Sequence, residues 1–203
     1  MNWHCWVLSK FAGDAPPREW INILDELKKV ISGKNIDKIE YASFVIRGER
    51  KARWLLDRAH SEYSTKNDAL GAAKKLTWLL MKSRGAPLIS KRLKRLLIND
   101  EKFIDETTTC PLCKEIIKID DYNLSGRNDL YSIQMGHLIP LSLKPRSHNA
   151  GNVVWMHRRC NYIQDEQTID NTINFLKQIL KTHEHIISTR RRKYVGGKGT
   201  KIS

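Results

Sequence analysis

Hydrophobic residues in the first hundred positions recur at three- and four-residue steps, which is the spacing of amphipathic helices. This spacing predicts four helices, over residues 16–33, 47–63, 67–82 and 90–99. Pro16 and Pro17 mark the start of the first helix and Gly33 its end, and the Gly85-Ala86-Pro87 segment breaks the chain after the third. Three tryptophans lie on the apolar stripes, which favours core packing over stacking on bases: Trp20, Trp54 and Trp78.

The second half of the chain has short apolar runs separated by loops, until a helical pattern begins near Thr168. Residues 130–135 form a β-like run, residues 100–109 are polar enough for a linker, and residues 1–9 favour a short strand only weakly. No acidic residue follows Glu184, so the end of the chain is typical of a disordered basic tail. We therefore expect an α+β chain with three parts: a mostly helical basic region (1–105), a compact module (106–187) and a basic tail (188–203).

The charge balance points to a polyanionic partner. The 203 residues include 36 Lys and Arg against 22 Asp and Glu, for a net charge of +14, and the pI is about 9.7. Such values are the usual footprint of nucleic acid binding, although a merely basic protein is the simpler alternative. The strongest basic run before the second half is residues 83–95, which is either a phosphate-contacting helix or a solvated helix face. Its proposed contacts are Lys91, Arg92, Lys94 and Arg95.

Two features bear on where the protein acts. No run of about 18 apolar residues is present, so no membrane span is expected. The first eleven residues lack a basic stretch followed by an apolar one, so no secretory signal is expected either. These observations favour a cytoplasmic protein with no membrane partner.

Two half-motifs predict a zinc site. Cys110 and Cys113 form a Cys-x₂-Cys pair, and His157 and Cys160 form a His-x₂-Cys pair further along the chain. Together they supply the four nitrogen and sulfur ligands of a closed tetrahedral zinc site, which leaves no position open for substrate. Unrelated buried thiols and a surface histidine are the alternative, but the second half-motif argues against it. The predicted role of this zinc is structural.

Further motifs lie between and directly after the two zinc half-motifs. They are Gly136-His137-x-x-Pro140, then Gly151-Asn152-Val153-Val154, and then Asn161 directly after the last predicted zinc ligand. In this order the elements resemble the HNH (ββα-metal) endonuclease family, in its zinc-containing His-Asn-Asn branch. The resemblance covers residues 107–175, about a third of the chain, and residues 136–166 are most similar to type II restriction endonucleases.

The resemblance implies roles for three residues. His137 is expected to be the general base, because a neutral imidazole can take a proton from water near neutral pH. Asn161 is expected to bind the catalytic Mg²⁺, or Mn²⁺ as a substitute, because hard cations prefer oxygen ligands. Asn152 is expected to brace a loop through backbone hydrogen bonds, and as a lone residue it is equally a simple turn residue. The implied products carry 5′-phosphate and 3′-hydroxyl ends.

The sequence departs from the family pattern at one position. Many members carry Asp or His just before the catalytic histidine as a further metal ligand, whereas this chain has Gly136. Asp165 is the best substitute, because it lies four residues after Asn161 on an expected helix, although a solvated helix residue is an equal reading. Arg158 and Arg159 stand at the expected start of that helix, where they are placed to meet phosphates.

Taken together, the sequence predicts a sequence-specific endonuclease for double-stranded DNA that can act as a homodimer. Its helical region would serve recognition or dimerisation. Three alternatives stay open: an HNH nuclease of a homing, phage or toxin type, a zinc module that binds DNA without cutting it, and an enzyme directed at RNA.

Overall fold

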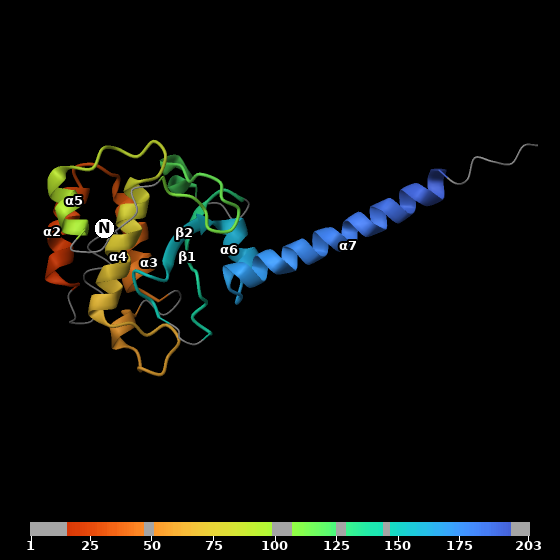
Figure 1. Cartoon of the computed structure of the whole chain (residues 1–203). Helices are drawn as coiled ribbons and strands as arrows, with labels where there is room; N and C mark the ends of the chain where they lie inside the picture. The colour runs from red at the N-terminus through yellow and green to blue at the C-terminus, as the bar shows by residue number, and fades with distance from the viewer. Residues whose placement is uncertain (1–15, 47–50, 99–106, 125–128, 144–146, 196–203) are drawn as a thin grey trace, which may run out of the picture.

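The computed structural model describes residues 16–46, 51–98, 107–124, 129–143 and 147–195, with side chains through residue 184 (Figure 1). The predicted strand at residues 1–9 and most of the predicted linker lie outside these ranges. So does the predicted boundary near residue 105. The described part is a mixed α+β structure, as predicted, with a two-stranded sheet and a larger helical part.

The described residues of the N-terminal region form four α-helices: α2 (Arg18–Leu27), α3 (Gly33–Phe44), α4 (Lys66–Met81) and α5 (Lys91–Leu97). Helices α4 and α5 begin where the sequence predicts, and each start is capped by a hydroxyl. Thr65 accepts a hydrogen bond from the Asp68 backbone N–H, and Ser90 accepts one from Leu93. The apolar stripes meet in a core that includes Trp20 and Trp78, which are 0% and 2% exposed.

The prediction of a helix over residues 47–63 is wrong. The described part of this segment holds only a short 3₁₀ helix, η1 (Arg53–Leu55), followed by turns. Side chains there bond to nearby backbone and so compete with helix formation, as Asp57 does by accepting from the Ala59 N–H at 2.7 Å. The helix α3 lies earlier in the chain, and Gly33 begins it instead of ending α2.

The sheet consists of β1 (Ile133–His137) and β2 (Val153–His157), which run antiparallel with His137 opposite Val153. Helix α6 (Arg158–Gln164) follows β2 directly. A two-stranded sheet is marginal by itself, and here it packs on the helical region. The indole N–H of Trp155 in β2 donates to the carbonyl of Leu76 in α4 at 2.7 Å, and buried residues from α2 to α6 form one hydrophobic cluster.

The last helix, α7 (Ile169–Val195), begins near the predicted position and extends away from the rest of the chain (Figure 1). It continues seven residues beyond 188, where the sequence predicted the start of a disordered tail, so that prediction is wrong as far as Val195. Polar residues are frequent along its length, and none of the helices in the described residues is long and apolar enough to cross a membrane.

Candidate active site and metal cluster

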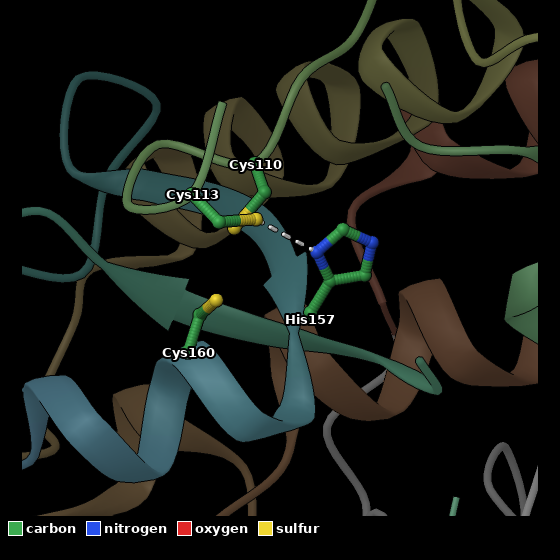
Figure 2. Close-up of side chains that lie close together, drawn as sticks. All are labelled: Cys110, Cys113, His157 and Cys160. Carbon is green, nitrogen blue, oxygen red and sulfur yellow. Dashed lines mark hydrogen bonds between the residues drawn. The ribbon is translucent and has the colours of Figure 1, made fainter. Parts of the chain in front are cut away.

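The four predicted zinc ligands come together in the structure (Figure 2). Their ligand atoms all lie within 4.8 Å of one another, and Nδ1 of His157 is 3.2 Å from Sγ of Cys113. Cys110 and Cys113 stand in a tight turn, in which the Lys114 N–H donates to the Cys110 carbonyl at 2.9 Å. His157 ends β2, and Cys160 lies in the first turn of α6. The cluster therefore ties the turn to the strand–helix junction.

The chemistry of this cluster suits a cation. Cys160 hydrogen-bonds to Cys110, which lowers the pKa of Cys110 to about 4 and raises the pKa of Cys160 above its usual range. Adjacent sulfurs oppose one another's ionisation unless a positive charge lies among them. Three thiols and one imidazole nitrogen are a donor set that fits a tetrahedral metal ion. Within the described residues, these four side chains could hold such an ion.

His137 and Asn161 lie at a cavity of about 730 Å³ between α3 and β1. His137 is the last residue of β1, and Asn161 lies one residue after the cluster ligand Cys160. The amide nitrogen of Asn161 donates to Oε1 of Gln134 at 3.2 Å, which fixes the orientation of the side chain. Lys38 joins the two walls, because its ammonium donates to the carbonyl of Ile133 in β1 at 3.0 Å.

A second, smaller hollow of about 240 Å³ also has His137 and Asn161 in its wall. Three carboxylates line it as well: Glu62, Asp165 and Glu166. Asp165 and Asn161 therefore line the same hollow, and the Asp165 N–H donates to the Asn161 carbonyl at 3.1 Å, as the predicted four-residue helical spacing requires. Helix α6 ends at Gln164, and Asp165 follows it with a φ of 48°, so a backbone turn brings its side chain to this hollow.

The environment of His137 keeps its imidazole neutral. Burial and, to a smaller extent, the positive charge of Arg53 lower the pKa of His137 to about 4, against the opposing effect of the Glu62 carboxylate. Arg53 is 3% exposed and forms an ion pair with Glu62. At neutral pH the ring of His137 can therefore accept a proton.

Asn152 holds the loop that follows β1. Its side-chain oxygen accepts from the Ile139 N–H at 2.7 Å, and its amide nitrogen donates to the carbonyls of Ile139 at 2.8 Å and Ser147 at 2.9 Å. Asn152 is 6% exposed, so these bonds are shielded from water. The loop on the carboxyl side of His137 is thus fixed to the loop that leads into β2.

Gly136 occupies a position with no room for a side chain. A Cβ there would overlap Sδ of the buried Met156 and would lie 3.0 Å from Oδ1 of Asn161. An Asp or His, which many members of the HNH family that the sequence resembles carry at this position, would therefore require the Met156 side chain to shift. The same geometry shows that residue 136 faces the Asn161 oxygen.

The predicted DNA-contacting residues fall into two groups. Arg158 and Arg159 start α6, where Arg158 donates to the Tyr162 hydroxyl at 2.6 Å and Arg159 to Glu115 at 2.5 Å. The basic residues of α5 lie beside α2, on the far side of α4 from the strands (Figure 1). The structure does not bring this second group to the cavities around His137.

The sequence does not predict a role at the site for Arg53 or Glu62, which come from the turn region that was predicted to be helical. Both lie far from the motifs along the chain, and no local pattern marks them. For His148 the sequence leaves open a contact with a phosphate or a loop cap, whereas in the structure its ring contacts His137 from the loop before β2. Arg53 and His148 are both buried, at 3% and 1% exposed.

The comparisons with known proteins show the family and the fold of the chain. The model of DraIII, a family of type II restriction enzymes, matches residues 52–160, which is just over half of the chain. The chain belongs to the DraIII family. Its fold is similar to a solved structure described as a crystal structure of a type II restriction endonuclease, with a TM-score of 0.65, 21% identity and 87% of each chain covered. No curated protein matches the sequence.

The matched segment contains the turn with Arg53 and Glu62 as well as His137, Asn152 and Cys160. The match thus covers the turn at Arg53 and Glu62 and the strand pair that carries His137, whereas helix α3, which also lines the cavity, lies before it. Asn161 and Asp165 follow directly after the match.

Proposed function

We propose that this member of the DraIII family is a type II restriction endonuclease that cuts double-stranded DNA by the HNH mechanism. The supporting observation is that His137 and Asn161, which come from different elements, line the same two cavities beside a Cys₃His cluster. The antiparallel strand pair followed directly by α6 has the element order expected of a ββα-metal module.

His137 acts as the general base in this proposal. Its neutral imidazole takes a proton from a water molecule, which then attacks the scissile phosphorus atom. The 3′-oxygen leaves, so the products carry 5′-phosphate and 3′-hydroxyl ends. The low pKa of His137, about 4, keeps the ring unprotonated over the neutral range, so the base is available without prior activation.

Asn161 and Asp165 are proposed to hold the catalytic metal. When bound, Mg²⁺ or Mn²⁺ would supply positive charge to the phosphate and the leaving oxygen. The amide nitrogen of Asn161 is engaged by Gln134, which leaves its oxygen for the ion. Asp165 is preferred over Glu62 as the carboxylate ligand, because Glu62 is already paired with Arg53.

The Cys₃His cluster is proposed to bind a structural zinc ion. All four ligand positions are protein groups, so the ion would have no open site for water or substrate. Its effect on the chemistry is indirect: it would fix the start of α6, and with it the position of Asn161, relative to β1. A metal ion of this kind stabilises small structures that bury little apolar surface, such as this two-stranded sheet.

DNA is proposed to approach the face that carries His137, with Arg158 and Arg159 contacting phosphates. Lys91, Arg92, Lys94 and Arg95 would add electrostatic attraction at a distance, because they lie on the other side of α4. A homodimer would present two such sites to a palindromic duplex.

The test is to incubate the purified protein with plasmid or phage DNA and Mg²⁺ and to map the fragment ends. Discrete bands with 5′-phosphate ends at a recurring sequence support the proposal. A smear of fragments would indicate a non-specific nuclease, and cleavage of structured RNA in preference to duplex DNA would contradict it. Binding to DNA without any cleavage in Mg²⁺ or Mn²⁺ would indicate a non-catalytic module instead.

A further inference from the structure

His148 occupies an unusual position beside the proposed general base. It belongs to the loop before β2, and its side chain is 1% exposed between β1 and the end of α3. Its Nδ1 lies 3.1 Å from Nε2 of His137, and its Nε2 lies 3.0 Å from the backbone carbonyl of Ser43. Its own carbonyl accepts a hydrogen bond from the Ser64 hydroxyl at 2.8 Å. The ring is therefore held at both nitrogens, and its backbone is held as well.

These contacts fix where the hydrogens are. A carbonyl oxygen only accepts hydrogen bonds, so Nε2 of His148 must carry the hydrogen that it donates to Ser43. Burial, the charge of Arg53 and the neighbouring His137 keep the pKa of His148 well below 6.5, so the ring is neutral and its Nδ1 has no hydrogen. The hydrogen between the two rings must then belong to Nε2 of His137.

We propose that His148 is a positioning residue that accepts the hydrogen bond from Nε2 of His137 and thereby leaves Nδ1 of His137 as the atom that takes the proton from water. This inference rests on the proposed nuclease function. His137, His148 and the carbonyl of Ser43 form a chain of hydrogen bonds, called the relay below. The Ser43 carbonyl comes from the last turn of α3, where helix carbonyls lack partners within the helix. The N-terminal region thus sets the orientation and tautomer of a base that lies more than 90 residues further along the chain.

The relay has a chemical consequence. When His137 takes a proton at Nδ1, the new positive charge is shared through the Nε2 hydrogen bond with His148, and from there reaches the carbonyl at the negative end of α3. A carboxylate in the place of His148 would do the same but would hold His137 protonated at neutral pH. A neutral imidazole orients the base and leaves it free to accept a proton.

The direct test needs no substrate. In ¹⁵N-labelled wild-type protein, NMR should show a ring hydrogen on Nε2 of both His137 and His148, with a scalar coupling across the hydrogen bond between Nε2 of His137 and Nδ1 of His148. A hydrogen on Nδ1 of either ring, or the absence of this coupling, would overturn the inference. Because this readout does not involve cleavage, it stands or falls separately from the nuclease proposal.

Two variants then test the functional role. His148→Leu removes the acceptor, and the maximal cleavage rate should fall roughly 10- to 100-fold with little change in the KM for DNA. His148→Gln keeps both an acceptor and a donor, and should retain most of the rate. Equal losses in the two variants, with zinc content and thermal stability like wild type, would contradict the relay. His183→Gln, on the exposed part of α7, is the control and should cut at the wild-type rate.

Discussion

The Cys₃His cluster and the cavity at His137 are neighbours, but they are built in opposite ways. The cluster is closed, and its ligands come from two short motifs, one in the turn at Cys110 and Cys113 and the other at the junction of β2 and α6. The cavity is open, and its walls combine β1 and α6 with α3 and the turn that holds Arg53 and Glu62. The proposed structural site draws on two short motifs alone, whereas the proposed active site is assembled from several distant segments.

The largest effect should come from breaking the cluster. Cys160→Ala removes one of four ligands, and because zinc binding and folding are linked, we expect the metal to be lost and the free energy of unfolding to fall by at least about 3 kcal/mol. Zinc content by atomic emission and urea unfolding measure this. Cys5→Ser, outside the motif, is the matched control. A Cys160→Ala protein with full zinc content and unchanged stability would refute a structural role for the cluster.

The second effect comes from a substitution in the cavity that leaves the Cys₃His cluster intact. Asn161→Ala removes the proposed metal ligand but no cluster residue, so the cleavage rate at saturating DNA should fall about 100-fold or more and the Mg²⁺ requirement should rise, with zinc unchanged. Cleavage across an Mg²⁺ titration and Mn²⁺ binding by electron paramagnetic resonance measure the two parts. Asn171→Ala, exposed on α7, serves as the control. Wild-type Mn²⁺ affinity in Asn161→Ala would exclude Asn161 as a ligand.

The third effect is on the pH dependence of stability. In the unfolded chain a histidine has a pKa near 6.5, whereas burial lowers the pKa of His137 to about 4 in the folded protein. Between these values only the unfolded chain is protonated, so the free energy of unfolding rises with pH, by up to about 1.4 kcal/mol per pH unit. This stability is present above pH 6.5 and is lost as the pH falls toward 4.

Replacing His137 with Gln should reduce that slope by the contribution of His137, while the contribution of the buried His148, whose pKa is also lowered, remains. Urea unfolding at about pH 5, 6 and 7 compares the wild type with His137→Gln, and His183→Gln controls for removing an exposed histidine. The difference between the wild-type and His137→Gln slopes should vanish at and above pH 7. Identical slopes below pH 6.5 would mean that the imidazole of His137 is not shielded from water as the structure indicates.

The same contrast explains which parts of the fold and of the candidate site the sequence could predict. The amphipathic helices now seen as α2, α4 and α5, the cluster ligands and the position of His137 at a strand end follow from local spacing and motif order. The helix α3 was not predicted. The turn at Arg53 was predicted to be helical, but an ion pair with Glu62 and side chain–backbone bonds override the local pattern there. Asp165 was predicted to continue the helix that carries Asn161; its N–H keeps the helical bond to the Asn161 carbonyl, but its positive φ ends the helix at Gln164.

Hydrogen-bond partners that come from distant segments could not be predicted from the sequence for a similar reason. His148 lies only 11 residues from His137, yet its role depends on the Ser43 carbonyl, 105 residues away. A backbone carbonyl leaves no trace in side-chain identity. Gly136 is the converse case. The sequence shows that it lacks a side chain, but only the structure shows that the buried Met156 on the paired strand occupies the space that a side chain would need.

The most direct measurement is the single-turnover cleavage rate of His137→Ala on duplex DNA with Mg²⁺, taken together with its zinc content. The account predicts a rate about 10²- to 10⁴-fold below wild type. It also predicts zinc content and stability at neutral pH close to wild type, because His137 lies outside the Cys₃His cluster. An undiminished cleavage rate in a folded, zinc-loaded His137→Ala protein would contradict it.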